Sequence, residues 1–581
     1  MKEKNTRIVV KRQNIIQACL IIFLIIILNL FSIRFFYRFD LTKEKRFSIT
    51  ESSKKILSDL NDNEKIYIEV YLDGDNLPFE LIRLQKTVRE FLNNLSSYSK
   101  NIDYVFINPF AGKKQEDQRN IAIELMSKQL FPTQLQVAAD GSVSQRMIFA
   151  GAIVKYAQKE YAVNFLNNNT LTQNTKNVSL SETELERDFI HAIWILSRKT
   201  VQKIAFLEGH SELDEDQTYD IMLSLSKYYQ IDRLTINQQL YALDEYSAVV
   251  IAKPQAKFSD QDKYIIDQYI MNGGSVLWLI EWIKINMDSL ANKPYEMAMI
   301  NDVRLSDQLF KYGVRINPDL IQDLTCLSIP VNVTTIDGKS SFEPTPWFYF
   351  PVIIPDTLSN HQLLKNLEPA RTHFVSSIDT VSEDYNVKKT ILLRTSEYSK
   401  SLTFPIQVSL TDLMREKPDI KTFNKSRIPI AVLLEGTFQS AFKNRFTLDT
   451  YENVELDFME ESKPDTKMIV ISDGDFIRNE IKTFGGRKEK LKLGQDFYYP
   501  NQYTPGNSQF IINCINYLCA DNDFISIRMR ETKIRLLNTT LLEQEKNFWI
   551  YINSLLPVVL IIIFGFTVIL IRKMKFKNKT K

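Results

Sequence analysis

The sequence predicts an α/β fold held in a membrane at both ends, and two observations lead to this expectation. First, three short apolar runs (Lys203–Leu207, Ala248–Ala252 and Ser275–Ile280) alternate with two segments of helical period. Apolar runs too short for helices, alternating with amphipathic helices, are typical of βαβ units around a parallel sheet. Second, one uncharged apolar segment of membrane-spanning length lies near each end of the chain.

The two helical segments of this central region carry start and stop signals. The first, Tyr219–Leu225, has Asp216 or Ser211 placed to cap its start. The second opens at Ser259 and closes at Gly273-Gly274. In open sheets of this kind, ligands bind at the carboxyl ends of the strands, so the loops that follow the apolar runs are the first places to look for function.

Composition excludes several classes of protein. The net charge is only +2, from 72 basic and 70 acidic side chains, so the overall charge gives no argument for nucleic acid as a partner. The four cysteines form no CxxC motif, which argues against a disulfide framework or a structural zinc site. The sequence predicts no metal site and no cofactor.

The apolar segments near the two ends are Ile15–Ile33 and Phe548–Ile571. Basic residues precede the first segment, and six of them follow the second with no acid among them, which places both termini in the cytoplasm by the positive-inside rule. No run between them is long enough to span a membrane, so the bulk of the chain is expected outside. Pro557 and Gly565 could kink the second span or let another helix pack closely against it. The alternative is that this span is a lipid-facing anchor without a packing partner.

A smaller α/β unit is predicted between the first span and Lys203. Its helices are expected near Ser48–Leu60, Phe79–Ser99, Asn120–Gln129 and Thr183–Ser197, and its strands at Lys65–Leu72, Ile102–Asn108, Gln134–Ala138 and Met147–Tyr156. The order βαβαββα, with Pro132 just before the hairpin, predicts a thioredoxin-like fold. No cysteine occurs between Cys19 and Cys326, so the thiol chemistry of that fold is excluded and a binding or spacer role remains.

Beyond Ile280, the sequence predicts more buried strands at Ile391–Thr395, Ile428–Leu434 and Lys467–Ser472, and a helix at Ser508–Leu518. The region reads as one open α/β domain with a long insertion. The predicted organisation is a cytoplasmic tail (1–14), a transmembrane helix (15–33), a juxtamembrane segment (34–64), the thioredoxin-like domain (65–198), the α/β domain (200–523) with its insertion near 328–425, a second juxtamembrane segment (524–547), a transmembrane helix (548–571) and a basic cytoplasmic tail (572–581).

Polar residues follow two of the predicted strands. Glu208, His210 and Glu212 come after Lys203–Leu207, and Asp473 and Asp475 come after Lys467–Ser472. If the two strands are neighbours, these side chains share one polar crevice of a kind that could hold a polar ligand or a metal ion. The alternative is that the adjoining glycines make turns and the acids cap the helices that follow.

Catalytic motifs are missing from the sequence, so no catalytic residue is predicted. No GxSxG nucleophile elbow occurs. The position after Ser275–Ile280, where an amidotransferase-like hydrolase could carry its nucleophile, is Glu281 rather than Cys or Ser. Gly338-Lys339-Ser340 has Val333 where the first glycine of a phosphate loop would stand, so the chain is not expected to hydrolyse ATP.

Several stretches resemble one family. They are Arg38–Thr42, Lys45–Ser48, Phe106–Pro109, Gly209–Leu213, Asp262–Trp278, Leu320–Cys326, Gly474–Asn479 and Ile525–Leu537. Together they resemble the gliding-motility-associated ABC-transporter auxiliary, or substrate-binding-like, proteins of Bacteroidetes, the GldG family. The resemblance extends over nearly the whole chain. It implies a central domain similar to class I amidotransferase-like and intraflagellar-transport-like α/β domains without their catalytic residues, with an open, flavodoxin-like α/β fold.

The resemblance also implies a function. It predicts a non-catalytic subunit of the bacterial inner membrane, with its bulk in the periplasm, that works with a separate ABC permease and a cytoplasmic ATPase. Two alternatives stay open: an envelope scaffold that holds glycan or peptide without transport, and a relic of a hydrolase or amidotransferase.

Overall fold

The structure is a computed structural model of the 581-residue chain. It describes residues 16–17, 19–27, 49–60, 64–74, 77–99, 101–139, 142–166, 174–198, 201–285, 287–334, 340–355, 361–365, 367–381, 386–410, 419–443, 458–499, 502–519 and 545–577. The chain divides into two units, Met1–Glu531 and Thr532–Lys581, and each is described by itself. The architecture is mixed α/β, with several sheets.

The N-terminal part of the first unit is built on a four-stranded sheet with the order β2-β1-β5-β6. Strands β1 and β2 are parallel, whereas β5 is antiparallel to both β1 and β6. The elements of this part are α2 (Glu51–Ser58), β1 (Ile66–Val70), α3 (Phe79–Tyr98), β2 (Ile102–Phe106), α4 (Gln115–Ser127), β3 (Thr133–Ala139), β4 (Ser142–Ile148), β5 (Gly151–Tyr156), β6 (Lys159–Asn164) and α5 (Asn174–Ser197).

Helices α3 and α5 pack on one face of this sheet, as their apolar spacing predicts. The inward positions of α3 (Leu81, Leu84, Val88, Leu92 and Leu95) and of α5 (Leu185, Phe189, Ile193 and Leu196) are all buried in one core with β1 and β5. A smaller cluster, which includes Leu125 of α4 and Ile153 of β5, lies on the other face. Helix α2 starts after Thr50, whose side chain caps it by accepting a hydrogen bond from the Ser53 amide.

Two details of this part differ from the sequence prediction. The expected return strand Met147–Tyr156 is two strands: β4 pairs only with β3 in a separate hairpin, and β5 enters the sheet. The break is at Phe149-Ala150, and β5 begins at Gly151, where an added Cβ would lie 2.5 Å from the Val163 carbonyl oxygen, so the backbones approach too closely for a larger residue. Strand β6 was not expected, because it is a charged edge strand with a weak apolar pattern.

The main sheet has seven strands in the order β20-β23-β24-β10-β9-β7-β8. Its elements are β7 (Lys203–Glu208), α6 (Tyr219–Leu225), β8 (Gln230–Thr235), β9 (Ala248–Ala252), α7 (Asp260–Met271), β10 (Ser275–Leu279), α9 (Ser306–Tyr312), β20 (Val387–Arg394), β23 (Pro429–Gly436), β24 (Thr466–Ile471) and α11 (Gly506–Leu518). The five strands from β24 to β8 are parallel, as expected for Lys203–Leu207, Ala248–Ala252 and Ser275–Ile280, whereas β23 runs antiparallel to both of its neighbours, β24 and β20.

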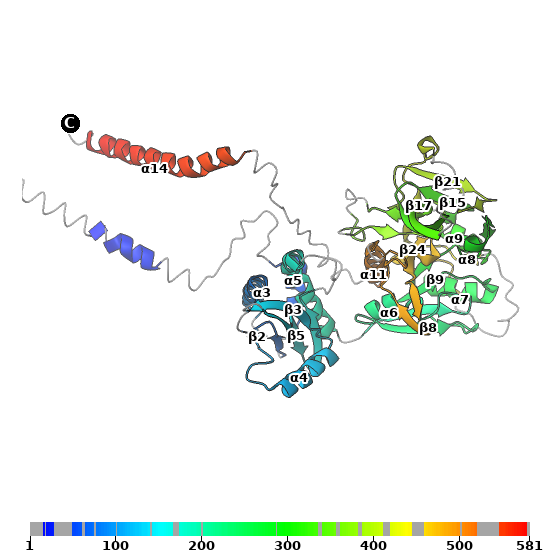
Figure 1. Cartoon of the computed structure of the whole chain (residues 1–581), viewed down its shortest axis with the longest axis horizontal. Coiled ribbons are helices and arrows are strands. Elements are labelled where there is room, and N and C mark those ends of the chain that lie inside the picture. The colour runs from blue at the N-terminus through cyan, green and yellow to red at the C-terminus, as the bar shows by residue number, and fades with distance from the viewer. Residues whose placement is uncertain are drawn as a thin grey trace, which may run out of the picture. The chain divides into compact units, whose positions relative to one another are not determined.

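Helices cover both faces of the main sheet, and the alternating strand residues divide between two cores. Helices α6 and α11 pack on one face with Phe206 and Leu277, and α7 and α9 pack on the other with Val249 and Trp278. The sheet runs between α11 and α7 in Figure 1. Burial of each such large apolar side chain stabilises the fold by about 1.5–3 kcal/mol.

The helix boundaries test the start and stop signals. Ser259 caps α7 by accepting from the Asp262 amide, and the chain leaves that helix through Gly273, whose φ is +94°. Helix α6 begins after Thr218, with no side-chain cap bond from that residue. The expectation that Asp216 or Ser211 caps it was wrong, since Asp216 instead pairs with Lys488 and Lys490.

Strands outside the main sheet begin at residue 283, well before the start of the insertion expected near 328–425. They are β11 (Ile283–Lys284), β12 (Glu296–Met297), β13 (Met299–Ile300), β14 (Val314–Ile316), β15 (Asp319–Asp323), β16 (Cys326–Thr334), β17 (Ser340–Ile353), β18 (Ala370–Arg371), β19 (Ile378–Thr380), β21 (Ser399–Thr403) and β22 (Gln407–Val408), with helices α8 (Met287–Asn292) and η1 (Ile420–Thr422). Trp347 of β17 and Ile283 of β11 belong to an apolar core cluster separate from those of the main sheet. After β24 come η3 (Gly474–Ile477), β25 (Ile481–Phe484) and β26 (Arg487–Lys490).

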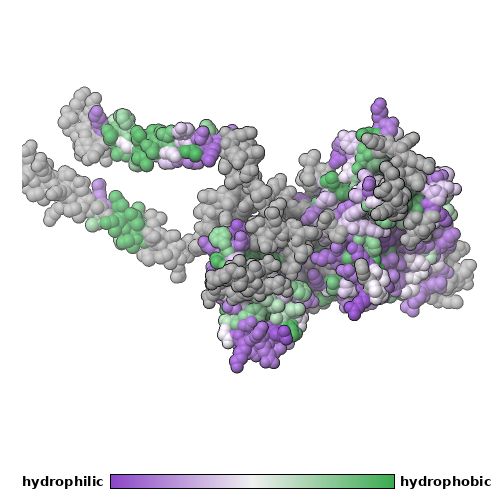
Figure 2. All heavy atoms as spheres, viewed as in Figure 1, coloured by the Kyte–Doolittle hydropathy of each residue, from purple (hydrophilic) through white to green (hydrophobic). Residues whose placement is uncertain are grey.

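The second unit contains α14 (Lys546–Lys577), which includes the predicted span Phe548–Ile571. Its segment Lys546–Ile571 has a mean hydropathy of 2.9 and is long and apolar enough to cross a membrane. Figure 2 shows it as a mostly apolar cylinder. Of the first predicted span, Ile15–Ile33, residues 16–17 and 19–27 are described, and these are helical and exposed. The rest of that span and residues 524–544 of the predicted juxtamembrane segment 524–547 lie outside the described residues.

Candidate functional site

The carboxyl ends of three adjacent parallel strands bring polar residues together. Residue Leu279 of β10 lies opposite Ala252 of β9 and opposite Ile471 of β24. The residues that follow these positions therefore meet at one edge of the sheet. Lys253 follows β9, Glu281 follows β10, and Asp473 and Asp475 follow β24.

These loops are joined by a buried group of ion pairs that we call the clasp (Lys253, Glu281, Asp475 and Arg478). The Lys253 Nζ lies 2.6 Å from both Glu281 Oε2 and Asp475 Oδ2. Arg478 Nη1 lies 3.0 Å from Asp475 Oδ1. The Glu281 and Asp475 side chains are only 4% and 7% exposed, so the pairs are largely shielded from water.

Close backbone packing holds the clasp together. An added Cβ at Gly474 would lie 2.5 Å from Lys253 Cγ and 3.1 Å from Lys253 Cα, so only glycine fits between the two loops. Lys253 itself has a φ of +52°, in the left-handed region that a lysine rarely adopts. The positions of both loops are therefore set by the clasp and by the packing around Gly474 together.

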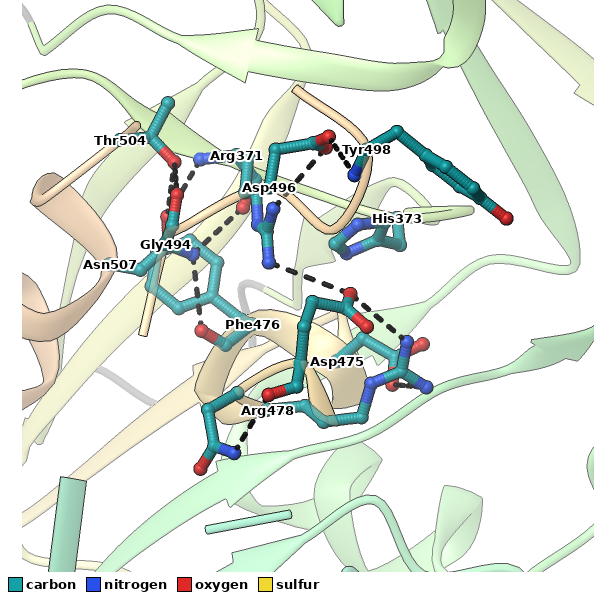
Figure 3. A network of polar contacts seen from close by, with 12 residues as sticks. Arg371, His373, Asp475, Phe476, Arg478, Gly494, Asp496, Tyr498, Thr504 and Asn507 are labelled. Carbon is teal, nitrogen blue, oxygen red and sulfur yellow. Dashed lines mark hydrogen bonds and ion pairs between the residues drawn. The ribbon is translucent and has the colours of Figure 1, made fainter. Parts of the chain in front are cut away.

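A second layer of charges surrounds the clasp. Arg478 Nη2 and Arg371 Nη2 both lie 3.6 Å from Glu480 Oε1, and Arg371 Nη1 lies 3.6 Å from Asp496 Oδ2. Figure 3 shows Arg371 between Asp496 and the loop that carries Asp475 and Arg478. Arg371 is only 2% exposed, and within the described part of the chain its Nη2 donates no hydrogen bond.

Asn507 of α11 fixes the backbone around Arg371. Its Oδ1 accepts from the Arg371 amide at 2.8 Å, and its Nδ2 donates to the carbonyl oxygens of Arg371 and Phe476 at 2.9 and 3.1 Å. The same carboxamide therefore ties β18 to η3. This arrangement positions Arg371 from the insertion next to the loop of Asp475, although the two residues are far apart in the sequence.

Asp473 and His373 form a buried polar pair at this edge. The Asp473 carboxylate accepts from the His373 amide and from the Asp475 amide, each at 2.8 Å. Burial raises the pKa of Asp473 well above its usual range, and the neighbouring charge of Asp475 raises it further. Burial lowers the pKa of His373 well below its usual value, so its imidazole is neutral at physiological pH.

The clasp balances desolvation against ion pairing. Burial, with the charge of Asp475, raises the pKa of Glu281 to about 7. Burial also acts against the charged forms of Lys253 and Asp475. The attraction of Lys253 to Asp475 and Glu281 outweighs burial and raises the pKa of Lys253. The attraction of Asp475 to Arg478 and Lys253 likewise outweighs burial and lowers the pKa of Asp475. Lys253, Arg478 and Asp475 are therefore ionised at neutral pH, and Glu281 is the member that titrates near it.

The other three predicted crevice residues lie in a separate cluster. Strands β7 and β24 are not neighbours, because β9 and β10 lie between them. His210 Nδ1 lies 3.2 Å from Glu212 Oε1, and its Nε2 lies 3.3 Å from Asp262 Oδ2. Its ring stacks on Phe258 with centroids 3.6 Å apart. Glu208 pairs with Arg233.

The His210 cluster joins the loop after β7 to the start of α7. Burial lowers the pKa of His210, but the hydrogen bonds to Asp262 and Glu212 outweigh it and raise that pKa to about 9. The condition for one shared crevice, that the two strands are neighbours, is thus not met. A ligand-binding role for Glu208, His210, Glu212, Asp473 and Asp475 stays a prediction.

Sequence reasoning missed Lys253, Arg371 and Arg478. The position of Lys253 gives a usable signal, because a cation directly after an entirely apolar strand falls at the carboxyl edge of the sheet. Arg371 has no local signal, since its role depends on a contact between the insertion and the loop after β24. Glu281, noted only because it is not a nucleophile, proves to be part of the clasp.

The chemistry available at this edge is ion pairing. Burial raises the pKa of Cys326 to about 12 and that of Cys514 well above its usual range, so both stay protonated thiols. The Ser472 hydroxyl, next to Asp473, donates to the carbonyl oxygens of Ser376 and Ile430. Among the described residues, no group of three or more His, Cys, Asp or Glu side chains is placed to hold a metal ion.

Comparison with known proteins identifies the family. Residues 201–514, more than half of the chain, match the family model described as an ABC-type uncharacterized transport system. The chain belongs to this family. It is an auxiliary component of an ABC-type transport system. Residues 43–155 match a domain of unknown function, DUF7088.

Two more distant similarities are found. An uncharacterized protein of Borreliella burgdorferi is 23% identical over 541 residues, which cover 91% of this chain and 92% of that protein. The solved mmIFT52 N-terminal domain matches with a TM-score of 0.30 and 12% identity, covering 55% of this chain and 97% of that one. The second likeness is too distant to inform the fold.

Proposed function

We propose that the chain is a non-catalytic subunit, anchored in the inner membrane, that couples or gates transport by a separate ABC permease and a cytoplasmic ATPase. The observation that carries this proposal is the family match over residues 201–514, which contain the whole main sheet. The apolar helix α14 gives the chain a means to reach the permease within the membrane. The bulk of the chain then lies in the periplasm, with both termini in the cytoplasm.

The geometry of the sheet edge supports a non-catalytic role. A catalytic group needs a reactive form and room for a substrate. Here Lys253 and Asp475 are held 2.6 Å apart as an ion pair, and the Cys326 and Cys514 thiols keep their protons. The clasp therefore serves to fix three loops in one arrangement, which is what a subunit that transmits a conformational change requires.

We infer that the N-terminal sheet is thioredoxin-like and that the main sheet is amidotransferase- or flavodoxin-like, each used as a scaffold. The order β2-β1-β5-β6, with β1 parallel to β2 and antiparallel to β5, supports the first assignment. Five parallel strands with helices on both faces support the second. A solved structure of each part that matches those folds over its full length is the test.

Co-purification tests the transporter assignment. The chain is tagged at its natural level of expression and extracted in a mild detergent, and bound proteins are identified by mass spectrometry. We expect a permease and an ATPase in the complex. The control is Leu560→Arg with Ile563→Arg, which places two charges in the middle of α14 and should release the chain from the complex. Recovery of the native chain alone contradicts the proposal.

Topology and gliding need separate tests. Protease added outside spheroplasts should cut the bulk of the chain, and cleavage only after lysis contradicts a periplasmic location.

The resemblance to the GldG family further suggests a role in gliding motility. Deletion of the gene should then abolish movement over a surface while growth continues, and unchanged movement would limit the proposal to transport.

A further inference from the structure

A second polar region of the first unit is an open groove, lined by residues other than those of the clasp. This polar groove is lined by Arg315, Asn317, Asp319, Ser377, Asp379, Ser401, Thr403 and Lys425, with Pro318, Ile428 and Pro429, and has a volume of 430 Å³. Sites for small molecules usually measure about 300–1,000 Å³, so the groove is large enough for a small ligand.

The floor of the groove is a rigid polar surface. Asp319 is 6% exposed, and its carboxylate accepts from the Ser377 amide at 2.8 Å and from the hydroxyls of Ser377 and Ser401 at 2.7 and 2.6 Å. Asn317 Nδ2 donates to Ser377 Oγ at 3.0 Å and to Asp379 Oδ2 at 2.9 Å. The side chains of the floor are thus oriented before any ligand arrives, which reduces the entropy lost on binding.

The charges on the walls are not paired with one another. Arg315 and Asp379 lie opposite each other in the β14–β19 pair, yet they form no ion pair. Lys425 is held beside Ser399 by two backbone hydrogen bonds of 3.0 and 3.2 Å. Within the described ranges of the chain, neither Arg315 nor Lys425 has an acidic partner. Two cations and one carboxylate are therefore available to a bound molecule.

We propose that this polar groove binds a small zwitterion, of the class of an amino acid or a short peptide. The ligand carboxylate contacts Arg315 and Lys425, and its ammonium contacts Asp379. Guanidinium groups recognise carboxylates through paired hydrogen bonds, which suits Arg315 to this role. None of the described residues that line the groove is aromatic, so the stacking surface that sugars and nucleobases commonly use is missing there.

Calorimetry on the purified full chain in detergent tests this inference. The probe is L-alanyl-L-alanine, and its matched control is N-acetyl-L-alanyl-L-alanine amide, which has the same backbone but neither charge. Glucose and inorganic phosphate are the neutral and purely anionic controls. We expect saturable binding of the free dipeptide and none of the blocked one.

Variants then locate the site. Arg315→Gln and Asp379→Asn should each weaken dipeptide binding about tenfold or more, because each removes one charge-assisted contact. Lys388→Gln, on a side chain that is 74% exposed on β20 and outside the groove, should leave binding unchanged. Equal binding of the blocked dipeptide, binding of phosphate alone, binding unaffected by Arg315→Gln, or no binding of any probe overturns the inference. The result does not depend on any transporter partner, so it is separable from the co-purification test.

Discussion

The clasp and the polar groove are two charged regions of the same unit, and they differ in how their charges are satisfied. In the clasp, Lys253 contacts two buried carboxylates at 2.6 Å. In the groove, Arg315 faces Asp379 across a strand pair without an ion pair between them. A group of charges can serve as a ligand site where the charges lack partners. Buried and paired charges instead fix the positions of the loops that carry them.

The largest expected effect is the loss of the central cation of the clasp. Lys253→Met leaves Glu281 buried without its partner, whereas Asp475 keeps Arg478. Removing one member of a buried pair costs about 3–5 kcal/mol, so the apparent thermal midpoint of the full chain in detergent should fall by several degrees. Adding Glu281→Leu should recover most of the loss. The control Lys388→Met should change nothing, and a Lys253→Met midpoint equal to wild type would show that the clasp is not structural.

The His210 cluster gives a pH-dependent test of the same idea. The pKa of His210 is raised from 6.5 to about 9 in the folded chain. Its contribution to stability is therefore complete below pH 6.5 and is lost as the pH rises through about 9. His210→Gln should cost about 2–3 kcal/mol at pH 6 and much less above pH 9. We expect the midpoints of variant and wild type, measured from pH 6 to 10, to converge.

A control separates this effect from general pH dependence. The pKa of His361 is lowered, chiefly by burial, so its imidazole is neutral in both the folded and the unfolded chain from pH 8 to 10. The difference between His361→Gln and wild type should therefore not vary with pH between 8 and 10. A His210→Gln difference that stays constant from pH 6 to 10 would mean that His210 is not held as an imidazolium by Asp262 and Glu212.

A third, smaller effect is expected from the close approach of the two loops of the clasp. Gly474→Ala places a Cβ 2.5 Å from Lys253 Cγ, and the neighbouring Lys253 Cα limits how far the loop can move away. Overpacking of this kind costs about 1–3 kcal/mol. Thermal unfolding should show a lower midpoint than wild type. A more stable variant would mean that the loops separate easily and that the clasp does not fix them.

The parts of the fold that were predictable carry local signals. Strands β7, β9, β10 and β24 are short apolar runs, and α7 is bounded by Ser259 and Gly273. Strands β6 and β8 were missed because edge strands are half-exposed and mix charged with apolar residues. The pattern of a strand shows that it is buried, but it does not show which strands lie beside it.

The same limit explains the outcome for the candidate site. The acids after β24 were found because strand ends meet at one edge of a sheet. Their partners Lys253 and Glu281 also follow strands and could be found by the same rule once the order β24-β10-β9 is known. Arg371 could not be found, because it reaches the edge from the insertion through bonds to Asn507.

The smallest expected effect distinguishes the polar groove from the clasp most directly. Arg315 has no ion-pair partner among the described residues, so Arg315→Gln should change the free energy of unfolding by less than about 0.5 kcal/mol, in contrast to Lys253→Met. Ser401→Ala is the matched variant on the floor of the groove, where it removes a hydrogen bond of 2.6 Å to the buried Asp319 and should cost about 1–2 kcal/mol. If Arg315→Gln lowers the thermal midpoint as much as Ser401→Ala does, then Arg315 is a structural residue. The groove would then be another closed ion-pair region rather than a site that awaits a ligand.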